Sequence, residues 1–172
     1  GTGTAVTAVS GEEIAYVGGT GVGGGTILGL CARMIGTSSY EHIAQLAKEG
    51  KMGRVDLTIG DITQNQLANM NNSTTAANFG KIPDDATDAD LAMGVINMVF
   101  QTIGIVSMMA AKAHGTDQIV LTGSLTRMEA AGQVIRSLEE LYGVHYIIPK
   151  KSEYSTAIGA ALYGQQQEKR KR

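Results

Sequence analysis

Glycines and threonines are the residues of this sequence whose types and spacing could do chemistry. Gly1-Thr2-Gly3-Thr4 opens the sequence, and six glycines fall among the eight residues 18–25. Missing side chains let a phosphate approach the backbone closely, and threonine hydroxyls can donate hydrogen bonds to its oxygens. The second run precedes a predicted helix, whose first N–H groups attract anions. Both segments therefore predict phosphate binding, near Thr2 and near residues 23–26.

The glycine run also fits a dinucleotide-binding fingerprint, because Gly19, Gly21 and Gly24 have the spacing G-x-G-x-x-G. A Rossmann unit needs a second apolar strand after its helix, and that strand ends in an acidic residue that binds the ribose. Glu41 lies near the required distance, but residues 36–42 show no apolar strand pattern. An NAD-binding dehydrogenase domain is therefore the weaker alternative.

The remaining ionisable residues predict neither a metal site nor a reactive thiol. His42, His114 and His145 have no cysteine or carboxylate at metal-ligand spacing. Cys31, the single cysteine, lies on the apolar face of a predicted helix, so we expect a core residue and no internal disulfide. No oxidising compartment is required, which favours a cytoplasmic protein.

Length and charge exclude several classes of function. The 172 residues suffice for one domain with a core, or for two small lobes. A mixture of 14 basic and 16 acidic residues gives a net charge of −2, so we expect no binding to nucleic acid or to an anionic membrane. Residues 94–112 are apolar, but polar residues such as Asn97 and Gln101 interrupt them, which predicts a buried helix. The basic residues 169–172 predict a solvated terminus.

Hydrophobic periodicity predicts the elements that must position the glycine segments. Residues 4–9 and 14–17 predict a β-hairpin, which leads into a glycine-rich loop over 18–25. Helices are predicted over 26–34, with Thr26 as the N-cap, and over 40–48. Residues 56–78 are the least regular part, with a short element near 55–59 and an asparagine-rich surface loop over 69–72.

The second half alternates helices and strands more clearly. Helices are predicted over 88–113, 127–142 and 152–163, and strands over 119–121 and 145–148. This order predicts an α/β layer with a parallel pair of strands, whose ligand lies beyond the carboxyl ends of the strands. Thr122-Gly123-Ser124 follows the first of these strands and is therefore expected at the site.

Several motifs together resemble the C-terminal half of type II pantothenate kinases. They are GTGT, a hairpin, GGTGVGGGTILGLC, TAANFG over 75–80 and LTGS over 121–124, in that order over essentially the whole chain. The resemblance implies an α/β fold, with residues 1–172 as one ribonuclease-H-like lobe of an actin-like ATPase. It also implies transfer of the γ-phosphoryl group of MgATP to the 4′-hydroxyl of pantothenate, the opening step of coenzyme A synthesis, by a homodimer.

The resemblance also implies roles for particular residues. The nucleotide would be bound by four groups of residues: Thr2, Gly3 and Thr4; Gly24, Gly25, Thr26, Ile27 and Leu28; Tyr40, near the adenine; and Gly123 and Ser124, on the purine side. Pantothenate would contact three residues, Tyr16, Thr75 and Ala76, of which the last two reach it across a dimer interface. The magnesium ion would accompany ATP, and no metal ligand is expected in this chain.

Two departures from the family pattern bear on activity. The family's Asp-x-Gly-Gly motif and its glutamate general base belong upstream of Gly1, so we expect an absent N-terminal lobe and no catalysis by this chain alone. Tyr16 occupies a position where many members have an arginine that helps to hold the substrate, and tyrosine supplies no fixed charge. A non-catalytic actin-like dimerisation or binding module is therefore the other alternative.

Overall fold

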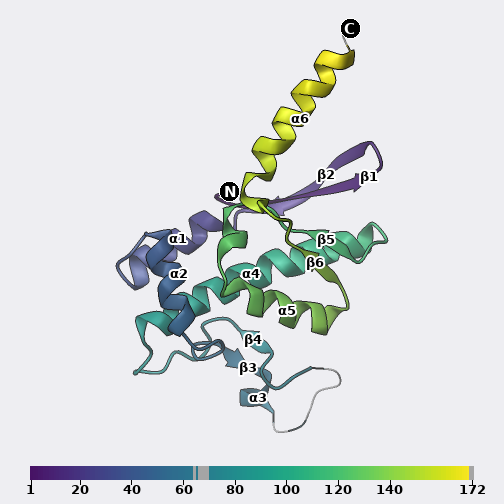
Figure 1. The fold of residues 1–172 in the computed structure, drawn as a ribbon. Coiled ribbons are helices and arrows are strands. Elements are labelled where there is room, and N and C mark those ends of the chain that lie inside the picture. The colour runs from purple at the N-terminus through teal and green to yellow at the C-terminus, as the bar shows by residue number, and fades with distance from the viewer. Residues whose placement is uncertain (64, 66–69, 171–172) are drawn as a thin grey trace.

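The computed structural model describes residues 1–63, 65 and 70–170 (Figure 1). Helices and strands are mixed, and the described strands form three separate two-stranded sheets. The predicted α/β class is confirmed at this level. Asn69 and residues 171–172, for which a surface loop and a solvated terminus were predicted, lie outside the described residues.

The predicted hairpin is present and is longer than expected. Strand β1 (Thr4–Ser10) pairs with β2 (Glu13–Thr20) in antiparallel register, with an irregularity between Val6 and Thr7. Gly11 lies in the turn with φ of 60°, a conformation that favours glycine. Since β2 continues through Thr20, the predicted loop over 18–25 is wrong at both ends.

Two helices follow the hairpin. Helix α1 (Gly24–Met34) begins two residues before the predicted start, and α2 (Tyr40–Glu49) lies where predicted. The N-cap of α1 is Gly23, so the prediction of Thr26 is wrong: the Thr26 Oγ1 atom accepts the Gly23 N–H at 3.1 Å from within the first turn. No strand is assigned between α1 and α2 in this described stretch, which removes the Rossmann arrangement.

Helix α4 (Asp88–Ala113) forms the centre of the core and contacts α1, α2 and α5. Thr87 and Asp90 form its capping box, in which the Thr87 Oγ1 atom accepts the Asp90 N–H at 3.2 Å. By length and composition alone α4 could cross a membrane, with 26 residues and a mean hydropathy of 1.7. However, 67% of its most apolar stretch is buried inside the protein, in agreement with the predicted buried helix.

The second half contains the predicted parallel pair. Strand β5 (Gln118–Val120) pairs in parallel with β6 (His145–Ile147). Helix α5 (Ala131–Tyr142) begins four residues after the predicted start at residue 127. The preceding residues form the 3₁₀-helix η1 (Ser124–Arg127), in which the Thr126 hydroxyl donates to the Gly123 carbonyl at 2.7 Å and holds the tighter turn.

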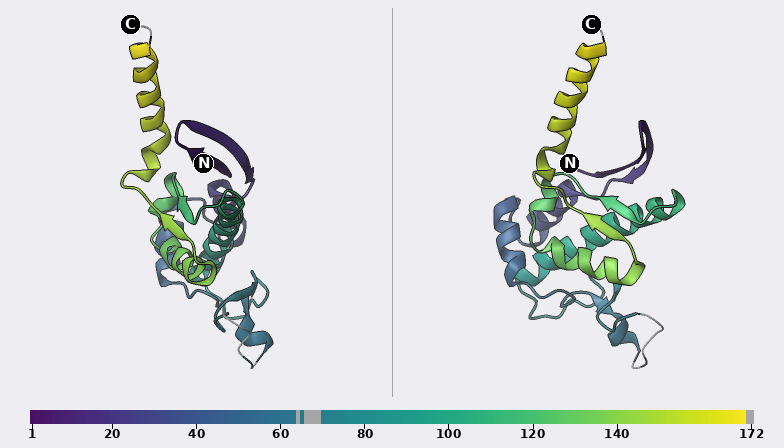
Figure 2. Two further views of the ribbon diagram at one scale, coloured as in Figure 1. Left: turned by 90° about the vertical axis from the view of Figure 1, so that its right-hand side faces the viewer. Right: turned by 45° about the vertical axis from the view of Figure 1, so that its right-hand side comes forward.

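The chain ends in the 3₁₀-helix η2 (Ser152–Tyr154) and helix α6 (Ser155–Arg170), which is longer than predicted. The irregular part contains three short elements, β3 (Leu57–Thr58), α3 (Ile59–Ile62) and β4 (Thr75–Ala77). In Figures 1 and 2 the β1–β2 hairpin and α6 project from one side of the core, and β3, α3 and β4 lie on the opposite side. Helix α4 lies between them.

Candidate functional site

The first residues of the chain lie against the start of α1. The Gly24 N–H donates to the Gly1 carbonyl at 3.3 Å, and the Gly25 N–H donates to the Thr2 carbonyl at 2.9 Å. The Thr4 hydroxyl donates to the Val22 carbonyl at 2.9 Å. The structure therefore brings together the two glycine segments near which the sequence predicted phosphate binding.

These contacts correct one part of that prediction. The N–H groups of the first two residues of α1 are already used by carbonyls, so they do not form an open anion site. A Cβ atom on Gly23 would lie 2.8 Å from both the Gly3 Cα and the Thr2 carbonyl oxygen, closer than side chains approach backbone. The glycine at 23 is therefore required for packing of two backbone segments.

The threonine hydroxyls are not equally available to a ligand. The Thr4 and Thr26 hydroxyls both donate to backbone carbonyls. The Thr26 hydroxyl donates to the Gly21 carbonyl at 3.3 Å. Thr2 is exposed, and its hydroxyl has no hydrogen-bond partner within the described part of the chain. Thr2 is the predicted phosphate contact whose hydroxyl is best placed to meet a ligand.

The LTGS segment closes the other side of this region. Gly123 has φ of 108°, and a Cβ atom there would lie 3.7 Å from the Gly1 nitrogen, so this turn is next to the first residue. From α2, the Tyr40 hydroxyl donates to the Ser124 carbonyl at 3.1 Å. The structure thus places Gly1, Thr2, the start of α1, Tyr40 and Ser124 around one region.

Ile27 and Leu28, two of the predicted nucleotide contacts on α1, pack against the core and differ in this from Gly24 and Gly25. The Ile27 side chain is fully buried in the core, so it supports the helix and presents no surface to a ligand. Leu28 is partly buried and packs against the same core. Gly24 and Gly25, at the first turn, remain next to residues 1–2.

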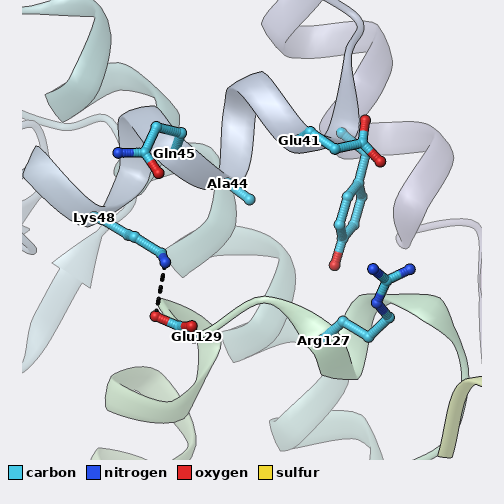
Figure 3. A pocket seen from close by; sticks show the side chains of 7 residues that line it. Glu41, Ala44, Gln45, Lys48, Arg127 and Glu129 are labelled. Atoms are coloured by element: carbon cyan, nitrogen blue, oxygen red, sulfur yellow. Dashed lines mark ion pairs between the residues drawn. The ribbon is translucent and has the colours of Figure 1, made fainter.

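A pocket of about 230 Å³ lies beside Tyr40, between α2 and the η1–α5 segment (Figure 3). Its lining residues are Tyr40, Glu41, Ala44, Gln45, Lys48, Arg127 and Glu129. The Arg127 guanidinium lies 6.0 Å from the centre of the Tyr40 ring, at the outer limit of a cation–π contact. Burial raises the pKa of Tyr40, which therefore stays neutral and can donate.

The sequence did not predict Arg127 or the ion pair between Lys48 and Glu129, whose charged atoms lie 2.9 Å apart. Figure 3 marks this pair with a dashed line. Arg127 follows Ser124 by three residues, so a 3₁₀ turn after LTGS would have indicated its position. The ion pair joins segments far apart in the sequence, and no local pattern signals it.

The three residues predicted to contact pantothenate do not lie together in one chain. Tyr16 is 73% exposed on β2, whereas Thr75 and Ala76 lie on β4, on the opposite side of α4 (Figures 1 and 2). Ala76 is exposed and Thr75 is partly buried. Across residues 1–63, 65 and 70–170, no three histidine, cysteine or acidic side chains gather where they could hold a metal ion.

Comparison with known proteins places these features in a family. A family model described as Fumble matches residues 1–162. A protein named type II pantothenate kinase from a strain of Bacillus cereus is 33% identical over 167 residues, which are 95% of this chain and 60% of that protein. The protein of the same name from Bacillus anthracis gives the same values. The one from Oceanobacillus iheyensis is 32% identical over 149 residues, 85% of this chain and 57% of that protein. The chain therefore spans about 60% of the length of the curated relatives it matches.

Proposed function

The chain belongs to the Fumble family, and from that membership we propose that it supplies the nucleotide-binding part of an ATP-dependent pantothenate kinase. The resemblance to type II pantothenate kinases that the motifs predicted is confirmed by the family match and the relatives. The observation that supports the role of this chain is the convergence of Thr2, the start of α1, Tyr40 and Ser124. The reaction would be the opening step of coenzyme A biosynthesis.

In this proposal Thr2 contacts the phosphates of ATP, and the pocket beside Tyr40 receives the base. The exposed Thr2 hydroxyl can donate to a phosphate oxygen, and the Tyr40 ring with the Arg127 guanidinium offers flat surfaces for a purine. Phosphoryl transfer depends mainly on such positioning and on charge stabilisation. We expect magnesium to arrive with the nucleotide, because the described residues offer no group of three metal-binding side chains.

We further propose that residues 1–172 form a ribonuclease-H-like lobe of an actin-like kinase, whose N-terminal lobe supplies the general base. Two observations support a covering partner for the projecting elements. Val9 and Ile14 of the hairpin and Ile158 and Leu162 of α6 are exposed apolar side chains on the same side of the core (Figure 1). The curated relatives are also longer than this chain.

A homodimer would account for the distance between the residues predicted to contact pantothenate. Tyr16 and Thr75 lie on opposite sides of α4, so one pantothenate molecule could contact both residues only if two copies contribute.

The single buried cysteine and the burial of α4 in the core agree with a cytoplasmic enzyme. The second candidate is a non-catalytic binding module, which is favoured by the use of the first α1 N–H groups in backbone packing.

Thermal unfolding with separate ligands tests the proposal. A ligand at a hundred times its Kd should stabilise the protein by about 2.7 kcal/mol. We expect MgATP and MgADP to raise the unfolding temperature and NAD to leave it unchanged. Stabilisation by NAD alone would contradict the kinase proposal. The binding module would be favoured if no nucleotide stabilises a chain that is shown to be folded and is supplied with an N-terminal lobe.

A further inference from the structure

Four polar side chains form a connected group between α4 and β4. Asp56 and Asn97 are 0% and 1% exposed, and they adjoin Thr75 and Gln101, which are partly buried. A buried polar group is costly unless its members are hydrogen-bonded, so such a group fixes the orientation of each member. This group contacts the TAANFG segment, which begins at Thr75.

Asp56 determines which way the Asn97 amide points. The Asp56 Oδ1 atom accepts the Phe79 N–H at 2.8 Å, and its Oδ2 atom lies 2.6 Å from the Asn97 Nδ2 atom. A carboxylate only accepts hydrogen bonds, so Asn97 must present its NH₂ group to Asp56 and direct its oxygen away. Phe79 has φ of 56°, rare for a residue with a side chain, and its bond to Asp56 helps to hold that conformation.

The orientation is passed from Asn97 to Gln101 and then to Thr75. The Asn97 oxygen accepts from the Gln101 Nε2 atom at 3.2 Å, which fixes the Gln101 amide as well. Both NH₂ groups then donate to the Thr75 Oγ1 atom, at 3.3 Å from Asn97 and 2.9 Å from Gln101. Two donors occupy the lone pairs of that oxygen, so its own proton must point elsewhere. Among the described residues no acceptor receives it.

We propose that Asp56, Asn97 and Gln101 are positioning residues that hold the Thr75 hydroxyl as an outward-facing hydrogen-bond donor to an oxygen of the bound alcohol substrate. This inference rests on the proposed function, in which that substrate is pantothenate. Pantothenate offers an amide carbonyl and a carboxylate, both of which accept hydrogen bonds. A hydroxyl whose acceptor capacity is already filled discriminates in favour of such oxygens and against a donor group.

The first test is the kinetics of the intact kinase with valine or serine at position 75. Thr75→Val keeps the shape and removes both the donor and the oxygen that accepts from the Asn97 and Gln101 amides. Because the substrate loses one hydrogen bond, KM for pantothenate should rise about five- to tenfold. The KM for ATP and kcat should stay within about twofold of the parent values. Thr75→Ser should retain most of the affinity for pantothenate. Thr74→Val is the matched control, because the Thr74 side chain makes no hydrogen bond in the described structure.

Asp56→Asn tests whether the orientation is relayed. Asparagine at this position has one oxygen for two donors, the Phe79 N–H and the Asn97 NH₂, so the Asn97 amide turns and its oxygen accepts the Thr75 proton. KM for pantothenate should rise as in Thr75→Val although Thr75 is present. The double variant should be no worse than Thr75→Val alone, because both changes remove one interaction. Additive effects, or an unchanged KM in Asp56→Asn, would overturn the relay.

Two further measurements keep the inference separable from the proposed function. If the intact kinase does not phosphorylate pantothenate, the proposed function fails, and the relay is then judged from the NMR signals of the Asn97 and Gln101 side-chain amides. Both signals should shift in Asp56→Asn and Thr75→Val and stay in place in Thr74→Val; unshifted signals in Asp56→Asn overturn the relay. With an active kinase, pantothenol, which lacks the carboxylate, identifies the oxygen. If Thr75→Val raises KM for pantothenate but not for pantothenol, the Thr75 hydroxyl donates to the carboxylate. If it raises KM for both compounds equally, the hydroxyl donates to the amide carbonyl. If KM changes for neither compound, the proposal is overturned.

Discussion

Replacement of Gly23 by alanine separates two explanations of the glycine run. The sequence predicted that these glycines let a phosphate approach the backbone, whereas the structure shows Gly23 packed against residues 2–3. An alanine Cβ atom would lie 2.8 Å from the Gly3 Cα and 2.8 Å from the Thr2 oxygen, and neither atom belongs to a flexible side chain. The first segment must therefore move away from α1.

The magnitude follows from what that movement breaks. Separation removes two hydrogen bonds, from Gly24 to the Gly1 carbonyl and from Gly25 to the Thr2 carbonyl. At about 0.5–1.5 kcal/mol each, Gly23→Ala should lower the free energy of unfolding by about 1–3 kcal/mol. Gly21→Ala is the matched control, because nothing lies within 4 Å of a Cβ atom there and its φ lies outside the left-handed region. It should change stability by less than about 0.5 kcal/mol.

Urea unfolding followed by circular dichroism, with nucleotide binding measured on the same samples, distinguishes the explanations. Packing predicts that Gly23→Ala loses stability and binding together, because the segment containing Thr2 is displaced. A direct role in phosphate approach predicts a loss of binding with unchanged stability. If Gly23→Ala unfolds at the same urea concentration as Gly21→Ala, the packing explanation is refuted.

Three other predictions concern single residues. The hydrogen bond from Lys81, with those from Thr58, lowers the pKa of Asp61 from 3.8 to about 2, so its stabilising effect is complete above about pH 4 and is lost as the pH falls towards 2. Asp61→Asn should therefore make unfolding stability less dependent on pH in that window. Burial raises the pKa of Cys31 to about 11, so the native protein at pH 8 should not react with a thiol-specific disulfide reagent, whereas the urea-unfolded protein should react fully. Tyr40→Phe removes the hydrogen bond to the Ser124 carbonyl and should cost about 0.5–1.5 kcal/mol in urea unfolding; an unchanged value would mean that this bond is not formed in solution.

The elements predicted correctly are those whose signals are local. Helix α4 has its capping box and apolar length within its own sequence, and its bounds agree with the prediction at both ends. The hairpin and the parallel strands β5 and β6 were also indicated by short apolar runs beside turn residues. The α/β class followed from the order of these elements.

The start of α1 could not be predicted, because it is set by contacts distant in the sequence. Carbonyls of Gly1 and Thr2 satisfy the first N–H groups of the helix, which begins at Gly24. The sequence offered Thr26 as the usual capping residue, but the backbone of another segment takes that role. The pocket beside Arg127 and the polar group around Asp56 depend on tertiary contacts in the same way.

Helix α4 connects the two parts of the proposed active site. It packs against α1, whose first turn meets Thr2, and it also provides Asn97 and Gln101, which orient the Thr75 hydroxyl. Because α4 is buried and its side chains are closely packed, the nucleotide region and the Thr75 donor are attached to one rigid element. Thr75 nevertheless belongs to β4, which lies on the opposite side of α4 from the nucleotide region of its own chain (Figures 1 and 2). In a dimer, the α4 of one copy would therefore fix the nucleotide in its own site and the acceptor contact in the site of its partner, so that neither site is complete in a single chain.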